Sequence, residues 1–306
     1  MLAGKSLAFL EECGRVQFCQ AIDIRINPYA DLGYQRASAC FEAILVRNGV
    51  PFHLEKHVSR LFNSARRLML YLHRDQDYIF EKASFIAYEN REIFPEGILK
   101  IFVSAHTEDG LRASSHPHIV IIEYPFLGYP PSIYEEGVAL GLLEYRRPFA
   151  EAKSTNAGYE VARLFLSDPA NANLYDVLFC DQDMGVRLAS ECSRSNFFYI
   201  MNNKVFTAPR ITITGQRQES RTLDGVTRSL VMRLLEDKAI APCEECEIRI
   251  THLNRIEACF ITSTTTGVLP VRSIGNYVFK TDHPVLRSLM AVFREYRESY
   301  FQSRLP

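Results

Sequence analysis

The sequence predicts an α+β protein, of the α/β type, that is built from two domains. Strand-like apolar runs alternate with segments of helical periodicity, without an internal repeat or a low-complexity segment. The length of 306 residues is about twice that of a typical domain. Residues 124–131 (YPFLGYPP) carry three prolines and a glycine, which resist both helix and central strand. We therefore expect a first domain at residues 1–123, a linker at residues 124–131 and a second domain at residues 132–306.

The first domain is expected to contain a hairpin, an amphipathic helix and two further strands. Residues 41–47 are β-rich and end at Asn48-Gly49, a dipeptide typical of two-residue hairpin turns. Apolar residues then recur at helical spacing over residues 54–68, which predicts a helix with one face in the core. The next strands are expected at residues 98–103 and 118–123.

The second domain continues the alternation of β-rich runs, turn signals and helical segments. Its helices are expected at residues 159–166 and 226–238. Its strands are expected at residues 138–145, 176–181, 196–201, 205–207, 258–262 and 268–271.

The balance of charge excludes several classes of partner. Lys and Arg number 35 against 36 Asp and Glu, so no strong overall field attracts nucleic acid or an anionic membrane. No apolar stretch approaches the roughly 18 residues that a membrane span needs. We expect a cytoplasmic protein without nucleic-acid or membrane partners, in which a local anion site is still possible.

The eight cysteines are scattered along the chain, as is usual for reduced thiols. Cys243 and Cys246 alone have the spacing of metal ligands, and no second pair of cysteines or histidines accompanies them in the sequence. We therefore expect no metal site.

Two charged residues at the ends of predicted elements are candidates for chemistry. Lys153 is followed by small polar residues and could form an imine if the fold lowers its pKa; the alternative is a solvated surface lysine. Glu191 precedes an aromatic-rich strand and could pair with a ring nitrogen; the alternative is a strand-end carboxylate in water.

Two further segments are suited to binding an anion. Residues 223–228 (LDGVTR) place a glycine turn and a threonine at a helix N-terminus, where free N–H groups favour an anion unless Asp224 caps them. Residues 262–267 (TSTTTG) offer hydroxyls and turn amides after a strand. Each of these features is a weak indication by itself.

In this order, the features resemble the fold type IV pyridoxal-phosphate enzymes, a group of branched-chain aminotransferases, D-amino acid aminotransferases and aminodeoxychorismate lyases. The resemblance spans roughly residues 25–272. The matching stretches are residues 31–42 (DLGYQRASACFE), 52–65 (FHLEKHVSRLFNSA), 152–156 (AKSTN), 191–197 (ECSRSNF), 224–228 (DGVTR) and 260–271 (FITSTTTGVLPV).

The resemblance implies a small N-terminal α/β domain, a larger C-terminal domain with a barrel-like sheet, bound pyridoxal 5'-phosphate and a homodimer. It implies that Lys153 forms the aldimine with the cofactor and later moves the α-proton, and that Glu191 holds the pyridinium nitrogen. The cofactor phosphate would be bound by Arg60, Val226, Thr227 and Thr264. Substrate contacts are expected from Arg36, Phe41, Lys100 and Thr265, with Thr264 also placed for the substrate carboxylate.

The chain departs from the family pattern in ways that concern the substrate. Arg36 and Ala37 stand where tyrosine and glycine are usual, and residues 104–106 (SAH) replace a Thr-Arg-Gly sequence. The tyrosine expected five residues after the lysine is displaced by one place, to Tyr159. Glu42 is typical of aminotransferases, whereas Lys100 and its neighbours are similar to the lyase branch.

Three hypotheses follow from the residues and the resemblance. The first is an aminotransferase that moves an amino group from an amino acid to a 2-oxo acid. The alternative is an aminodeoxychorismate lyase, which makes p-aminobenzoate and pyruvate. The third is a protein that binds the cofactor without turnover.

Overall fold

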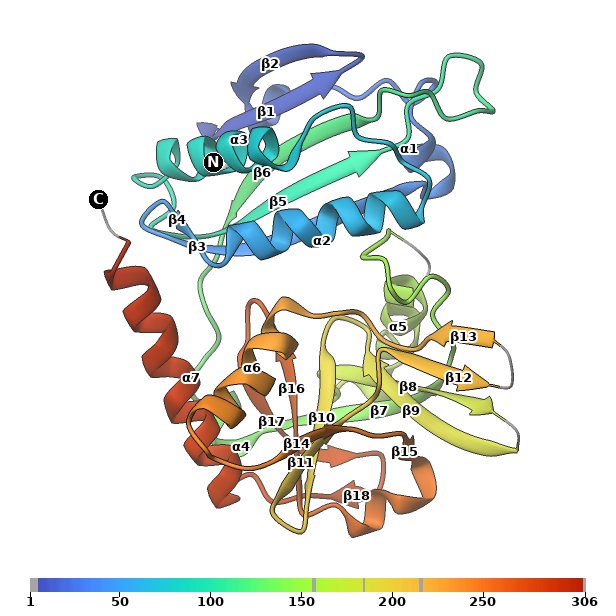
Figure 1. Ribbon diagram of the computed structural model, residues 1–306, viewed down its shortest axis with the longest axis vertical. Helices are drawn as coiled ribbons and strands as arrows, with labels where there is room; N and C mark the ends of the chain where they lie inside the picture. The colour runs from blue at the N-terminus through green and yellow to red at the C-terminus, as the bar shows by residue number, and fades with distance from the viewer. Residues whose placement is uncertain (1–4, 156–157, 184, 215–216, 305–306) are drawn as a thin grey trace. The chain divides into compact units, whose positions relative to one another are not determined.

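The computed structural model describes residues 5–155, 158–183, 185–214 and 217–304 (Figure 1). The chain divides into two compact units. The first comprises the chain up to Gly128, a short segment from Ala152 to Asn156, and the end of the chain from Ser299; the second comprises the rest. The division at Gly128 falls within the expected linker. The other two segments lie within residues 132–306, the range expected for the second domain. They belong to the first unit because most of their contacts are with it.

The first unit contains one six-stranded sheet in which every neighbouring pair is antiparallel. Helices α2 (Leu54–Arg67) and α3 (Gln76–Glu89) pack along it (Figure 1). Their buried apolar side chains form the core of this unit together with those of the sheet. In spatial order the strands are β2 (Arg15–Gln20), β1 (Leu7–Glu12), β6 (His118–Pro125), β5 (Glu96–Ser104), β3 (Ala39–Arg47) and β4 (Val50–Pro51).

The expected hairpin and helix of this unit are confirmed. Strands β3 and β4 meet at Asn48 and Gly49, whose φ angles of 48° and 79° are those of a tight two-residue turn. Helix α2 has its apolar face in the core, as its sequence pattern predicts. Ser64, a polar residue of this helix, is fully buried.

The second unit is built on a closed barrel. Strands β9, β10, β16, β17, β7 and β8 pair in that order, and β8 returns to β9, so that a ring of six strands is complete. The barrel-like sheet implied by the resemblance is thus confirmed. The strands of the ring are β7 (Val138–Glu144), β8 (Asp176–Asp183), β9 (Val186–Cys192), β10 (Asn196–Met201), β16 (Ala258–Ser263) and β17 (Gly267–Ile274).

Further elements extend the two units. Helix α7 has residues in both, since its last residues from Ser299 belong to the first. Among the described residues, no helix combines the length and apolar character needed to cross a membrane. The further helices and strands of the two units are α1 (Leu32–Arg36), α4 (Ser132–Glu136), α5 (Gly158–Leu166), α6 (Val226–Asp237), α7 (Pro284–Gln302), β11 (Lys204–Thr207), β12 (Ile211–Thr214), β13 (Arg217–Ser220), β14 (Cys243–Glu245), β15 (Ile248–Arg249) and β18 (Tyr277–Val278), with short 3-10 helices at Ala21–Asp23, Pro169–Asn171 and Ile250–Arg255.

Candidate active site

The backbone of Lys153 is held beside the start of β3 in the first unit. The N–H of Phe41 donates to the carbonyl oxygen of Lys153 at 2.9 Å, and the N–H of Thr155 donates to Ala39 at 3.0 Å. The N–H of Lys153 itself donates to the buried hydroxyl of Ser64 at 3.0 Å. These bonds fix the position from which the lysine side chain extends. Asn156, the last residue of the AKSTN motif, lies outside the described residues.

The Lys153 side chain meets an aromatic face of the sheet. Its Nζ atom lies 4.8 Å from the centre of the Phe41 ring, and Phe41 stacks on Phe102 at 5.9 Å. Lys100 extends from the same face, with Nζ 5.0 Å from the centre of the Tyr124 ring. Partial burial lowers the pKa of Lys100. The structure therefore brings three of the expected residues, Lys153, Phe41 and Lys100, to one side of one sheet.

The opposite face of β3 carries a buried charged group. Glu42 accepts hydrogen bonds from Arg60 (Nε to Oε1, 2.8 Å; Nη2 to Oε2, 2.6 Å) and contacts Nδ1 of His57 at 2.8 Å. Burial alone would raise the pKa of Glu42, but the Arg60 charge and the hydrogen bonds lower it to about 2. Burial lowers the pKa of His57, although Glu42 opposes this effect. Arg60, which was expected to bind the cofactor phosphate, thus forms an ion pair with the Glu42 carboxylate.

Arg36, expected near the substrate, and Tyr159, a candidate for contact with the cofactor ring, are both exposed. Arg36 lies in the last turn of α1, and Ala37 after it has a φ of 55°. Tyr159 is 55% exposed in the first turn of α5.

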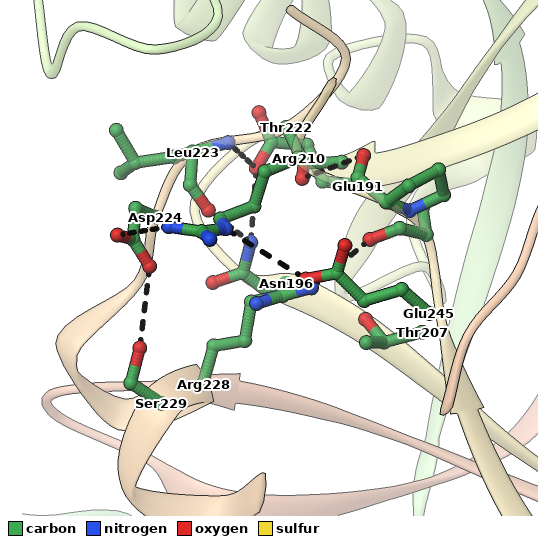
Figure 2. A network of polar contacts seen from close by, with 12 residues as sticks. Glu191, Asn196, Thr207, Arg210, Thr222, Leu223, Asp224, Arg228, Ser229 and Glu245 are labelled. Carbon is green, nitrogen blue, oxygen red and sulfur yellow. Dashed lines mark hydrogen bonds and ion pairs between the residues drawn. The ribbon is translucent and has the colours of Figure 1, made fainter. Parts of the chain in front are cut away.

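Glu191 is buried in the second unit, close to Asn196 and Leu223 (Figure 2). Its Oε2 atom accepts hydrogen bonds from the N–H of Leu223 at 3.0 Å and from Nδ2 of Asn196 at 3.2 Å. Its Oε1 atom lies 2.5 Å from Nη2 of Arg147. Glu191 is therefore an oriented, ion-paired carboxylate, and the alternative of a strand-end glutamate in water is wrong.

The helix that was expected to bind an anion begins close to Glu191. Gly225 is the N-cap of α6 and has no side chain with which to cap the first turn, which contains Val226 and Thr227. Asp224 pairs with Arg210 and accepts a hydrogen bond from Ser229 (Figure 2). The backbone N–H groups of this turn have the orientation that favours an anion.

A row of paired residues across three barrel strands, which we call the rung, connects Glu191 to the threonine turn, residues 262–267. Glu191 of β9 lies opposite Asn196 of β10, which in turn lies opposite Thr262 of β16. The turn after Thr262 includes Thr264 and Thr265, and a hydrogen bond of 3.0 Å from the Tyr134 hydroxyl to the carbonyl of Thr266 holds it in place. Asn196 also donates to the carbonyl of Leu223 at 2.9 Å, which ties the rung to the segment before α6.

Sequence reasoning missed the residues that hold the charged groups in place. Arg147 and Asn196 orient Glu191, and His57 and Ser64 contact Glu42 and Lys153. A signal was present for Asn196, since it is the one polar residue that opens an otherwise apolar and aromatic strand. Arg147 follows another arginine, and the sequence does not show which of the two turns inward.

Comparisons with known proteins agree with this geometry. The family described as amino-transferase class IV matches residues 39–274. D-alanine aminotransferase of Bacillus licheniformis is 26% identical over 268 residues, 86% of this chain and 87% of that protein. The structure of a branched-chain aminotransferase from Thermoproteus uzoniensis with norvaline superposes with a TM-score of 0.78 at 18% identity, covering 95% of this chain and 94% of that one. The structure of 4-amino-4-deoxychorismate lyase from Pseudomonas aeruginosa has a TM-score of 0.72 at 22% identity, covering 89% and 95%.

Proposed function

The chain belongs to the class IV aminotransferases, and on that premise we propose which of its residues bind the cofactor, which move the proton and which substrates it takes. The family match makes the protein a pyridoxal-phosphate-dependent aminotransferase. The lyase named above shares the fold at 22% identity, and a shared fold does not by itself indicate a shared reaction. The observation that carries the assignment of residues is the backbone environment of Lys153, which sets one amine above the Phe41 ring.

The residues present fit the cofactor. Pyridoxal phosphate offers an aldehyde, a ring nitrogen and a phosphate, and when bound it supplies an electron sink for negative charge at the substrate Cα. An amine (Lys153), a buried carboxylate (Glu191) and the first turn of α6 match these three groups. The family match is the ground on which we propose that these residues serve one cofactor.

We assign Lys153 two roles: its Nζ would attach the cofactor, and it would carry the proton that leaves the substrate Cα for the aldehyde carbon of the cofactor. The bonds to Phe41 and Ser64 hold the lysine backbone still while Nζ moves. Glu191 keeps a proton on the ring nitrogen, because Arg147, Asn196 and the Leu223 N–H hold its carboxylate in one orientation.

The phosphate and the substrate carboxylate need donors of hydrogen bonds. For the phosphate we assign the N–H groups of Val226 and Thr227, the hydroxyls of Thr227 and Thr264, and the guanidinium of Arg60. An arginine has five N–H donors, so Arg60 can contact a phosphate while two of its nitrogens bond Glu42. Substrate contacts are assigned to the sheet face and the threonine turn, namely Phe41, Lys100, Arg36, Thr264 and Thr265.

An amino donor and a 2-oxo acid are the substrates that this family takes. We further propose that the protein is a homodimer, as the family resemblance implies, and that it works in the cytoplasm, where its eight free cysteines stay reduced. Light scattering of the purified protein tests the dimer.

A panel of amino donors tests the function. Purified protein with pyridoxal phosphate is mixed with D-alanine, branched-chain L-amino acids, L-glutamate or aminodeoxychorismate, and the cofactor absorbance is followed. We expect at least one amino acid to bleach the cofactor band and a 2-oxo acid to restore it. Release of pyruvate and p-aminobenzoate from aminodeoxychorismate, with no response to any amino acid, would instead establish the lyase.

Lys153→Ala tests the assignment of the amine. After borohydride reduction, mass spectrometry should find the cofactor on the peptide with Lys153 in the wild-type protein and on no lysine of the variant. Lys204→Ala is the matched control, because Lys204 is about half exposed, pairs with the exposed Glu244 at 3.2 Å and should keep full turnover. Unchanged turnover in Lys153→Ala would contradict the assignment.

A further inference from the structure

Three side chains with metal-binding atoms meet in the first unit at a place that the aminotransferase assignment does not use. Cys13, His106 and His118 each offer one such atom, and the three atoms lie within 4.8 Å of one another. The Sγ atom of Cys13 is 3.1 Å from Nε2 of His106, and the two histidine rings are 4.7 Å apart between centres. The residues come from the β1–β2 turn, the segment after β5 and the first position of β6.

The two histidines are buried and incompletely hydrogen-bonded. His118 is 2% exposed and His106 is 7% exposed. Within the described chain, Nε2 of His118 and Nδ1 of His106 make no hydrogen bond. Oε1 of Glu12 lies 3.5 Å from Nε2 of His118. A buried ring nitrogen without a partner is costly, so Nε2 of His118 points to a ligand that this nitrogen can bind.

The Asp31 carboxylate contacts Nδ1 of His118, which leaves Nε2 of His118 as the nitrogen available to the cluster of Cys13, His106 and His118. Oδ2 of Asp31 lies 2.8 Å from Nδ1 of His118, and Asp31 is itself held by the hydroxyl of Ser104 and the N–H of Tyr34. An aspartate at this distance takes the Nδ1 proton as a hydrogen bond, so that Nε2 of the neutral ring carries the lone pair toward Cys13. This carboxylate–histidine arrangement is the one that usually supports a metal ligand.

We propose that Cys13, His106 and His118 bind one Zn²⁺ ion, with a water molecule as the fourth ligand. One thiolate and two imidazoles are ligands that zinc prefers, and three protein ligands with a water in the fourth position are a known arrangement for zinc. Zinc bond lengths place a sulfur and a nitrogen ligand about 3.5 Å apart and two nitrogens about 3.3 Å apart. The observed separations of 3.1 to 4.8 Å therefore need only small rotations, and Cys13 is exposed and able to make them.

The position of Cys13 agrees with this proposal. Cys13 and Gly14 form the β1–β2 turn with φ angles of 50° and 76°. Asparagine, aspartate or glycine is usual at the first of these positions, so a cysteine there has a conformational cost. The Glu12 and Glu108 carboxylates act electrostatically on Cys13, and such negative charges attract a divalent cation. A bound Zn²⁺ would tie this turn to β6 and to the segment after β5.

The test measures zinc binding by the full-length protein with its cofactor. Protein is treated with a chelator and desalted, and Zn²⁺ is added in competition with a chromophoric chelator, with bound zinc counted by mass spectrometry. We expect one tightly bound Zn²⁺ per chain. Asp31→Asn should weaken binding about 10–100-fold, since it removes only the support of a ligand, and Cys13→Ser should weaken it more. Co²⁺ in place of zinc should give a thiolate charge-transfer band in the difference spectrum, absent in Cys13→Ser.

Cys246→Ser is the matched control, because Cys246 is the other exposed cysteine and has the ligand-like spacing with Cys243. It should bind zinc as the wild-type protein does. Less than one zinc per chain, equal affinity in Cys13→Ser, or loss of zinc in Cys246→Ser would each overturn the proposal. Circular dichroism of each variant shows whether it is folded, and Cys13 itself lies on an exposed turn.

Discussion

The guanidinium of Arg60 donates two hydrogen bonds, at 2.8 and 2.6 Å, to the fully buried carboxylate of Glu42. Arg60 comes from α2 and Glu42 from β3, so the pair joins the helix to the sheet. It also places the arginine head group at one fixed point. A phosphate-binding arginine that is positioned in this way loses less conformational freedom on binding.

Glu42→Gln is expected to destabilise the protein by about 3 kcal/mol at pH 7, because it leaves a buried arginine without its counter-charge. The pKa of Glu42 is about 2 in the folded chain and 4.5 ordinarily. The stabilisation is therefore present above pH 4.5 and is lost as the pH falls toward 2. Urea unfolding at pH 7 and pH 4 checks this: the gap between wild type and variant should be narrower at pH 4. A gap that stays constant would mean that Glu42 is not ionised in the folded chain.

Arg147→Gln is expected to cost about 3 kcal/mol of stability and to weaken cofactor binding, since it removes the cation beside buried Glu191. The neighbouring variant Arg146→Gln is the control. Arg146 is about half exposed and pairs with Glu219 and Asp181, so its loss should cost less than about 1 kcal/mol. Thermal unfolding with and without cofactor separates the two effects. If the two variants lost equal amounts of stability and bound the cofactor equally well, the ion pair of Arg147 with Glu191 would contribute no more than the exposed pairs of Arg146.

Gly225→Ala should disturb the hydrogen bonds of Asn196. An added Cβ would lie 2.0 Å from Oδ1 of Asn196, while the φ of −68° at this position suits alanine well. The clash forces Asn196 to turn away from Glu191 and Leu223, at an expected cost of about 1–3 kcal/mol. The double variant with Asn196→Ala has no such clash, so the two changes together should cost less than their sum. Urea unfolding of the three variants measures the coupling, and strict additivity would argue against the clash.

Glu123→Gln should make the protein more stable in mild alkali. Burial raises the pKa of Glu123 to about 8, although Asn90 acts in the opposite direction, and the Glu123 side chain packs over Gly97, which has no Cβ to obstruct it. A carboxyl whose pKa is raised on folding stabilises the protein below its ordinary pKa of 4.5, and this stabilisation is lost as the pH rises toward 8.

The loss for the wild-type protein is up to about 5 kcal/mol, from about 1.4 kcal/mol per pKa unit. Unfolding in urea at pH 6 and pH 9 should show a smaller decrease for Glu123→Gln than for the wild type. Glu92→Gln is the control, because that side chain is 85% exposed and should leave the pH dependence unchanged. A wild-type protein whose stability does not fall between pH 6 and pH 9 would contradict the raised pKa.

Much of the fold could be predicted because its signals are local. The Asn48-Gly49 turn and the apolar stripe of α2 are set by residues within one or two turns of the chain. Helix α3 was missed, because aromatic and apolar residues occur around most of its circumference and leave no clear periodicity. The closed barrel could not be read from the strands themselves, since it depends on the pairing of β8 with β9 and of β9 with β10.

The sequence by itself determined the alternation of many of the strands and helices and, through the resemblance, the cofactor, and it predicts Lys153 as the residue that attaches it. Only the tertiary structure decided which charges are paired: Arg60 with Glu42, and Arg147 with Glu191. It also brought Cys13 and His106, 93 residues apart, to within 3.1 Å. Ion pairs and metal clusters form between side chains that are distant in sequence, and their strength depends on distance and burial, which a linear pattern does not contain.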